Sequence, residues 1–457
     1  MKRKLLPLIA LSLLFACLPG GLFAEQEEAP SAPSPLPQAT TNDQPIIEEA
    51  TPAAQALEEP SPVAVTVFPQ FPLQFTSTAE PIRPYAAGTR LSIDFITMIT
   101  RQAGWALAGD HVLRTSDGGQ IWEDVTPPQP SMRDIEVDQE AVGFFLDPEH
   151  AWVLFVPELG YAPEFSEIWS TQDGGITWQA SQILLSQSGD YYDPSLHFLS
   201  ATRGWFLGEV SWVGAGTHFD YLLVHTEDGG KTWEGNRPTP GCTYTDLAFA
   251  DENTGWMTRA CLGPYGPYVI PDLLITRDGG LTWDEVDLPP PAGNPGLFDD
   301  YEYCATFQPT LFDPAAGRVA MECFGYDYQQ SPGVSFLYAS DDGGATWQVN
   351  PLPNPMRTTR IRVEGSDGGT LSIGPLPRSQ LVWFDPEEGL HLGQKSYRTE
   401  DGGLSWEFVH EVIWLGQFSF VDPQYGWAVA RTGAESALVV TTNGGQSWDI
   451  LEPQIGP

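Results

Sequence analysis

Basic residues are scarce in this 457-residue chain, which has 21 Lys and Arg against 60 Asp and Glu and a formal net charge of −39. Such a charge repels polyanions, so nucleic acid and anionic membrane surfaces are excluded as partners. The chain also lacks HExxH, GxSxG, CxxC and phosphate-loop patterns, and its seven His residues have no metal-ligand spacing. These absences exclude the common signatures of metalloproteases, serine hydrolases, zinc sites and nucleotide-binding proteins, and we expect no cofactor and no metal.

Long apolar runs are missing as well, apart from residues 5–16, which follow a basic start. This run is too short to span a bilayer as a helix, but its length is typical of a signal-peptide core. Residues 14–17 resemble a lipoprotein signal, in which Cys17 would be lipidated, whereas ordinary cleavage after Ala24 is the alternative. We therefore expect an extracytoplasmic protein, either a cell-surface or periplasmic lipoprotein or a secreted one.

The segment after the signal is rich in Pro, Ala, Glu, Ser and Thr. Such a composition buries too little apolar surface to offset the entropy of ordering the chain. The sequence thus predicts three parts: an export signal at 1–24, a disordered tether at 25–80 and a folded domain at 81–457.

A turn-forming motif recurs seven times in the folded domain. The copies read TSDGGQIW, TQDGGITW, TEDGGKTW, TRDGGLTW, SDDGGATW, TEDGGLSW and TTNGGQSW. Its carboxylate or amide positions are Asp117, Asp173, Asp228, Asp278, Asp342, Asp401 and Asn443. An Asp or Asn side chain accepts backbone N–H bonds within a turn, and paired glycines allow positive φ. We expect these seven side chains to have a structural role.

A second motif, Gly-Trp (Ala-Trp in copy two) followed by an apolar strand, precedes most copies of the first. Its indoles are Trp105, Trp152, Trp205, Trp256 and Trp427, and Arg318 and Leu390 occupy this position in copies five and six. Each repeat then supplies four strands, which we name a to d, with the DGG turn between c and d. The sequence predicts an all-β fold, a single seven-bladed β-propeller of four-stranded antiparallel blades. The stretch 63–75 is a candidate closing strand.

Four cysteines lie in the folded domain, in two pairs with the same separation. In each pair the first Cys begins strand a and the second ends strand b, so an antiparallel hairpin places them opposite one another. We predict the disulfides Cys242–Cys261 and Cys304–Cys323, which suit an oxidising compartment.

The DGG turns resemble the Asp-box (BNR-type) repeats of sialidases, sortilin-type receptors, xyloglucan-cleaving glycosidases and the photosystem II assembly and stability factor family. The resemblance covers about residues 90 to 450, and seven copies with the Gly-Trp motif look most like the assembly-factor family and its bacterial relatives. That likeness implies a non-catalytic propeller that binds a protein partner at the membrane or cell surface. Our first hypothesis is therefore an exported, monomeric binding or scaffold protein that is not an enzyme.

The alternative is a secreted glycoside hydrolase, sialidase-like or xyloglucanase-like, with a carboxylate-based site. Such an enzyme needs a carboxylate pair across a cleft, and 60 acidic residues do not single out a pair. The sequence also lacks the Arg-Ile-Pro motif that a sialidase resemblance would imply. No catalytic residue is predicted.

The b–c loops of blades two to five are long and carry aromatic side chains, and one d–a loop on the same face adds two more. Exposed loop aromatics are enriched at interfaces, although they can also fold down and cap the blades. The predicted binding residues are Tyr161, Phe165, Trp212, Tyr265, Tyr268, Tyr301, Tyr303, Tyr326 and Tyr328.

Overall fold

The computed structural model describes residues 66–67, 82–128, 139–157, 165–184, 194–213, 218–236, 242–262, 269–300, 303–324, 333–355, 379–433 and 435–457. The chain divides into two units, Met1–Ser61 and Pro62–Pro457, and every described residue belongs to the second. The predicted export signal, Cys17 and nearly all of the predicted tether therefore lie outside the described residues and stay predictions.

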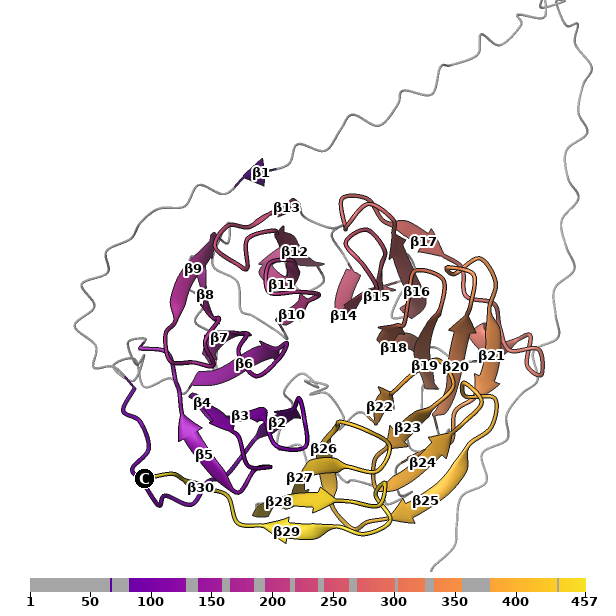
Figure 1. Cartoon of the computed structure of the whole chain (residues 1–457). Helices are drawn as coiled ribbons and strands as arrows, with labels where there is room; N and C mark the ends of the chain where they lie inside the picture. The colour runs from indigo at the N-terminus through magenta and orange to yellow at the C-terminus, as the bar shows by residue number, and fades with distance from the viewer. Residues whose placement is uncertain are drawn as a thin grey trace, which may run out of the picture. The chain divides into compact units, whose positions relative to one another are not determined.

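Seven four-stranded antiparallel blades form a ring, which confirms the predicted seven-bladed β-propeller (Figure 1). Blade 1 contains β2 (Phe95–Met98), β3 (Gly104–Ala108), β4 (His111–Thr115) and β5 (Ile121–Asp124). Blade 2 contains β6 (Gln139–Phe145), β7 (Ala151–Pro157), β8 (Phe165–Thr171) and β9 (Gln179–Leu184). Blade 3 contains β10 (Ser195–Phe198), β11 (Gly204–Val213), β12 (His218–Thr226) and β13 (Glu234–Asn236). In each blade the strands lie in chain order from the centre of the ring outward.

The remaining four blades repeat this order. Blade 4 contains β14 (Cys242–Phe249), β15 (Gly255–Leu262), β16 (Val269–Thr276) and β17 (Asp284–Val286). Blade 5 contains β18 (Tyr303–Leu311), β19 (Gly317–Phe324), β20 (Val334–Ser340) and β21 (Gln348–Pro351), preceded by the one-turn helix α1 (Leu297–Asp300). Blade 6 contains β22 (Gln380–Trp383), β23 (Gly389–Leu392), β24 (Lys395–Thr399) and β25 (Glu407–Glu411). Blade 7 contains β26 (Leu415–Phe420), β27 (Gly426–Thr432), β28 (Glu435–Thr441) and β29 (Asp449–Leu451).

The glycine of the Gly-Trp motif opens strand b because an aromatic ring lies against it. Gly204 pairs with Phe198 at the end of strand a, and a Cβ on Gly204 would come within 2.2 Å of the Phe198 ring. Gly255 and Phe249 repeat this arrangement in blade 4. Only glycine allows the ring of strand a to cross strand b at this distance.

The tryptophan of the same motif joins one blade to the next. The Trp152 indole of blade 2 stacks on Phe198 of blade 3 with ring centroids 3.5 Å apart, and Trp205 of blade 3 stacks on Phe249 of blade 4 at the same separation. Both indoles are fully buried. The hydrophobic core is thus divided into layers between the blades, and the repeat motif builds each layer.

The ring is closed by short backbone contacts between the two ends of the propeller. The last strand, β30 (Gln454–Ile455), adds to β5 in parallel. The Gly88 N–H donates to the Ile455 carbonyl at 2.8 Å, and the Ile455 N–H donates to the Thr89 carbonyl at 3.0 Å. The candidate closing stretch 63–75 is described only at β1 (Thr66–Val67), which pairs with β13 of blade 3.

One of the predicted disulfides is described. Cys304 and Cys323 are bonded and link strands a and b of blade 5, at opposed positions of the β18–β19 pair. Cys242 and Cys261 face each other in the same register in blade 4. Their side chains lie outside the described residues, so that bond stays a prediction.

Candidate functional site

The DGG turns on one face of the ring are occupied by their own hydrogen bonds. In blade 2, Asp173 accepts the Thr177 N–H at 2.8 Å and the Thr177 hydroxyl at 2.6 Å. The Thr171 hydroxyl donates to Asp173 at 2.9 Å and accepts the Gly175 N–H at 2.9 Å. The bonds from Thr177 hold the pKa of Asp173 below its ordinary value, and both glycines have positive φ. Such carboxylates stay ionised and are poor general acids.

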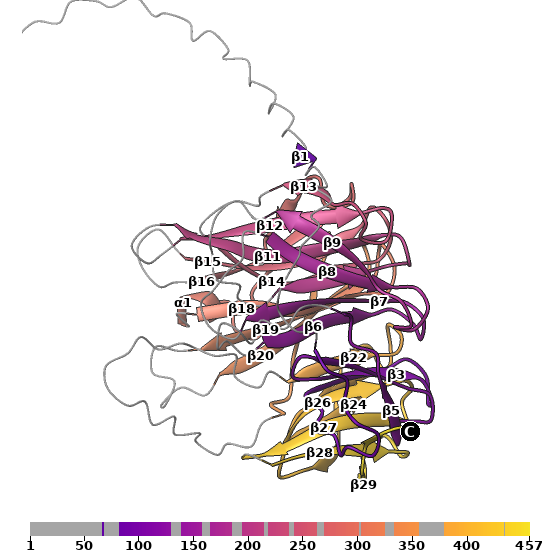
Figure 2. The ribbon, with the colours of Figure 1, turned by 90° about the vertical axis from the view of Figure 1, so that its left-hand side faces the viewer.

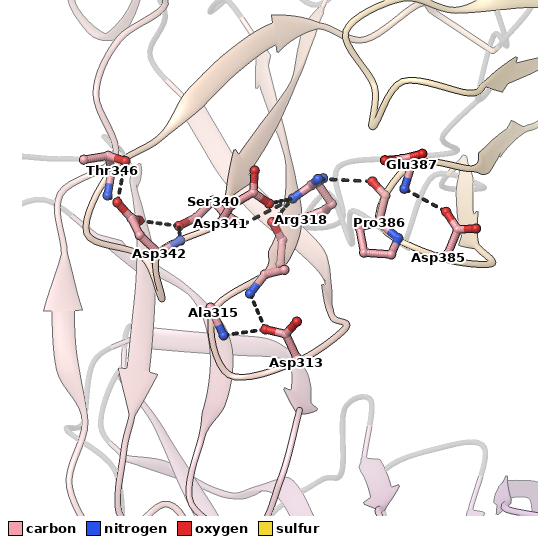
Figure 3. Close-up of polar contacts among 12 residues, drawn as sticks. Asp313, Ala315, Arg318, Ser340, Asp341, Asp342, Thr346, Asp385, Pro386 and Glu387 are labelled. Carbon is pink, nitrogen blue, oxygen red and sulfur yellow. Dashed lines mark hydrogen bonds and ion pairs between the residues drawn. The ribbon is translucent and has the colours of Figure 1, made fainter.

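The Gly-Trp indoles and Arg318 bridge neighbouring blades on this face. The Trp152 indole donates to the Gly229 carbonyl in the DGG turn of blade 3 at 2.8 Å, and Trp427 of blade 7 reaches Gly118 of blade 1 at 3.0 Å. In blade 5 the buried Arg318 replaces the indole and donates to the Pro386 carbonyl of blade 6 at 3.1 Å (Figure 3). The polar groups of this face therefore serve the fold.

The sequence predicts an aromatic binding surface on the opposite face. Tyr161, Tyr265, Tyr268, Tyr301, Tyr326 and Tyr328 lie outside the described residues. Phe165, Trp212 and Tyr303 lie in β8, β11 and β18, but their side chains are not among those described. The strands that lead to this face are long in blade 3, where β11 has ten residues against five for β3 in blade 1. Figure 2 shows these hairpins reaching toward the side of the ring where α1 lies.

Polar side chains on the innermost strands connect consecutive blades at the centre of the ring. In blade 6, Gln380 accepts the Phe418 N–H of blade 7 at 2.9 Å and donates to the Phe418 carbonyl at 2.8 Å. In blade 7, Gln417 does the same with Ile96 of blade 1, at 2.9 and 3.0 Å. In blade 5, Gln308 holds the Leu381 N–H and the Ser379 carbonyl of blade 6. We call these side-chain contacts between innermost strands the inner belt.

Blade 4 continues the inner belt with a carboxylate instead of an amide. Asp246 accepts the Gln308 N–H of blade 5 at 3.1 Å. Asp246, Gln308, Gln380 and Gln417 are equivalent, because each lies three residues before the residue that pairs with the first residue of strand b. Of the innermost-strand side chains that the structure describes, Asp246 is the one carboxylate. It is half-buried.

His197 completes the belt between blades 3 and 4. Its Nε2 accepts the Phe249 N–H at 3.3 Å, and its ring lies 5.6 Å from the Phe144 ring of blade 2. Burial lowers the pKa of His197 to about 4. The imidazole is therefore neutral at pH 7, with Nε2 unprotonated so that it can accept this bond.

Two other titratable groups lie away from the innermost strands. In blade 1, His111 contacts Asp124 at 2.9 Å and stacks on Tyr85, whose N–H donates to the same carboxylate. Burial raises the pKa of Asp124, but the hydrogen bonds that its carboxylate accepts, the largest of them from His111, together outweigh burial, so the pKa lies below its ordinary value. The contacts of Tyr85 with Asp124 and His111 attach the start of the propeller to its first blade. Burial raises the pKa of Glu167, which lies on the third strand of blade 2.

Neither a metal site nor a membrane-spanning helix is found among the described residues. No group of three or more His, Cys, Asp or Glu there could hold a metal ion. Likewise, no helix in the part that the structure describes is long and apolar enough to cross a bilayer.

Sequence reasoning missed Asp246 and the inner belt. The signal was present, since the equivalent positions of strand a read Asp, Gln, Gln and Gln in blades 4 to 7. It could have been found only by aligning strand a on the Gly-Trp motif, because polar residues on a strand ordinarily indicate an exposed face.

No family model matches this sequence. Over 206 residues the chain is 27% identical to a xyloglucanase of Paenibacillus sp, a match that covers 40% of this chain and 19% of the relative. The chain thus spans less than two thirds of the relative that it matches.

Several solved structures are similar to this chain. A puromycin-hydrolyzing peptidase of Mycobacterium tuberculosis is 13% identical with a TM-score of 0.48, covering 82% of this chain and 57% of the other. The polysaccharide lyase Uly1 is 9% identical with a TM-score of 0.47 (80% and 93% covered), and a GH93 α-L-arabinofuranosidase of Fusarium graminearum is 15% identical with a TM-score of 0.42 (71% and 96% covered). At these scores the likeness carries no argument about function.

The xyloglucanase match corrects the sequence interpretation. A non-catalytic binding protein of the assembly-factor type was predicted, and an enzyme was not. Both predictions are wrong, because the sequence similarity found is to a glycoside hydrolase and not to an assembly factor. The predictions failed because the repeat motif builds the blades of the fold. Binding proteins and enzymes share this motif, so it does not distinguish their activities.

Proposed function

We propose that this chain is an exported glycoside hydrolase that acts on a plant-type polysaccharide of the xyloglucan class. The observation that carries the proposal is the 27% identity over 206 residues to a xyloglucanase. Because that match covers only 19% of the relative, the substrate class is part of the proposal.

The structure supports the proposal through the distribution of polar groups. One face is occupied by turn contacts. Among the described residues, the innermost strands at the centre of the ring carry amides and one carboxylate. Amide and carboxylate groups are suitable partners for sugar hydroxyls, since each provides donors or acceptors in a fixed direction. The site therefore belongs at the centre of the ring and on the face of the long b–c hairpins.

Export and the nature of the repeat are part of the same proposal. The Cys304–Cys323 disulfide is typical of proteins outside the cytoplasm, where polysaccharides are encountered. We infer that the seven DGG turns are Asp-box repeats, because each is built by the same carboxylate or amide contacts. Lipidation at Cys17, the monomeric state and a protein partner stay predictions.

Hydrolysis of purified polysaccharides by the full chain tests the proposal directly. We expect new reducing ends on xyloglucan, and fewer on unsubstituted cellulose, arabinan and a polyuronate. Retention of the protein in a gel that contains xyloglucan measures binding separately. Neither hydrolysis nor retention with any of the four polysaccharides would overturn the proposed function.

A further inference from the structure

The junction between blades 4 and 5 differs from the rest of the inner belt in its charge. Blades 5, 6 and 7 use the neutral amides of Gln308, Gln380 and Gln417 at the equivalent position. Blade 4 uses Asp246, in a protein whose other described innermost-strand side chains include no carboxylate. With a net charge of −39 the chain has acidic residues in abundance, so it is informative that the described innermost strands carry a single carboxylate.

The backbone is also irregular on both sides of this junction. The pairing of β14 with β15 shifts between Tyr244 and Leu247, and that of β18 with β19 shifts between Phe307 and Thr310. Each shift therefore includes one member of the contact, Asp246 or Gln308. Bulges next to active sites re-aim a side chain that a regular strand would hold in the ladder.

Gln308 has a φ of +49° and is the one non-glycine residue with positive φ among the described residues. For a side chain such as glutamine this conformation is strained, and it persists only where surrounding contacts enforce it. The contacts are present: the Gln308 amide is held by Leu381 and Ser379 of blade 6, while its backbone N–H points at Asp246. The strained backbone conformation of Gln308 therefore directs its N–H toward the Asp246 carboxylate.

Thr258 holds Asp246 from the second strand of the same blade. The Thr258 hydroxyl accepts the Asp246 N–H at 3.0 Å and lies 3.3 Å from the Asp246 carbonyl. Thr258 is fully buried, so this support is rigid. The backbone of Asp246 and its carboxylate are therefore fixed by different neighbours, as expected for a preorganised group.

Hydrolysis of a glycosidic bond passes through a transition state in which the sugar ring carries positive charge. A fixed carboxylate stabilises that charge more than it stabilises the neutral ground state, and so raises kcat more than it lowers KM. The N–H of Gln308 donates a hydrogen bond that keeps the carboxylate in place.

We propose that Asp246 is a catalytic carboxylate that faces the sugar ring at the centre of the propeller, and that Gln308 is its positioning residue. This inference rests on the proposed function and deepens it, because it assigns the electrostatic part of the reaction to one residue. Asp246 stabilises the charged ring through space, and no bond to it is formed or broken.

The substitution Asp246→Asn tests the charge alone. Asparagine keeps an oxygen that can accept the Gln308 N–H, so we expect the Tm to change by less than about 2 °C. We expect kcat on xyloglucan to fall at least about 100-fold, with KM within about threefold. Asp246→Gln, which introduces the residue of the other belt positions, should fold and be equally inactive.

A matched control is available in the same blade. Asp251 accepts the Asn253 and Thr254 N–H groups in the turn on the opposite face, so Asp251→Asn should leave kcat unchanged.

Gln308→Ala removes the amide contacts to Leu381 and Ser379 that enforce the positive φ, so the backbone N–H should no longer be held on Asp246. We expect kcat to fall about tenfold with KM unchanged. Gln308→Gly keeps the N–H and adopts positive φ without strain, so it should retain more of kcat than Gln308→Ala.

The outcomes separate this inference from the proposed function. If the Asp246 variants retain kcat within threefold of the wild type, the assignment is wrong and the hydrolase proposal stands. A kcat of Gln308→Ala within threefold of the wild type would remove the positioning role. A wild-type chain that neither cleaves nor binds a polysaccharide would overturn both proposals together.

Discussion

Blades 4 to 7 and blades 1 to 3 have the same fold but different inner walls. In blades 4 to 7 the equivalent position of strand a carries a side chain that hydrogen-bonds to the following blade. In blades 1 to 3 that position is occupied by Phe95, Val142 and Ser195, none of which makes such a bond among the described residues. The two halves show that the centre of the ring is not fixed by the repeat.

The difference follows from what the repeat motifs have to do. The DGG turn fixes the c–d connection, and the Gly-Trp motif fixes the contact between blades through stacked rings and indole bonds. Neither motif includes the inward face of strand a. Residues there are free to vary without loss of the fold, so this is where a propeller can differ from one blade to the next and acquire a site.

The largest expected effect on stability concerns the one titratable imidazole of the belt. His197 has a pKa of about 4 in the fold and an ordinary value of 6.5, so the unfolded chain takes up a proton first as pH falls. Stability should be unaffected above about pH 6.5 and should fall between 6.5 and 4, by up to about 3 kcal/mol. Urea unfolding at several pH values measures this dependence.

His197→Asn provides the comparison, because asparagine can accept the Phe249 N–H and does not titrate. We expect the difference in unfolding free energy between wild type and variant to change across this pH interval. A difference that is constant from pH 7 to 4 would contradict the assignment of His197 as a neutral acceptor.

The second-largest expected effect on the free energy of unfolding comes from substitution at the contact between blades 7 and 1. Gln417→Leu leaves the Ile96 N–H and carbonyl without their partner, and Ile96 is fully buried. We expect a loss of about 2 kcal/mol in unfolding free energy, measured by urea denaturation. Ser195→Ala, at the equivalent position in blade 3, should cost less than about 0.5 kcal/mol. Similar losses in both variants would mean that the two halves do not differ.

The smallest effect is a gain. Ser195→Gln introduces into blade 3 the amide that blades 5 to 7 use, facing the innermost strand β14 of blade 4. If the introduced amide makes the same contact in blade 3, the free energy of unfolding should rise by about 0.5–1 kcal/mol, the net contribution of one added hydrogen bond. A Tm that falls on this substitution would show that the position in blade 3 cannot accommodate the amide.

Much of the fold was predictable because its signals are local. A DGG turn is recognisable wherever it occurs, since the carboxylate and the two glycines interact within a few residues of the chain. Opposed Cys304 and Cys323 could be inferred from a hairpin register for the same reason. By contrast, Arg318 replaces an indole by reaching Pro386 in the next blade, and nothing near Arg318 in the sequence indicates that contact.

The candidate site was not predictable, because its residues are separated along the chain and meet only in the ring. Asp246 and Gln308 belong to different blades, and the positive φ of Gln308 is enforced by a third blade. The loop aromatics were predicted as binding residues because aromatic side chains on loops are enriched at interfaces. A single aspartate among 60 acidic residues has no such signal.

The sequence by itself determined the number of blades, the strands within each blade and the structural role of the repeated turns, because these depend on interactions within one hairpin. The tertiary structure decided how the ends of the propeller meet, which residue replaces a missing indole and which carboxylate belongs to the inner belt. These depend on closing the ring, which brings strand a of each blade beside strand a of the next, in the described contacts across intervals of 38 to 321 residues.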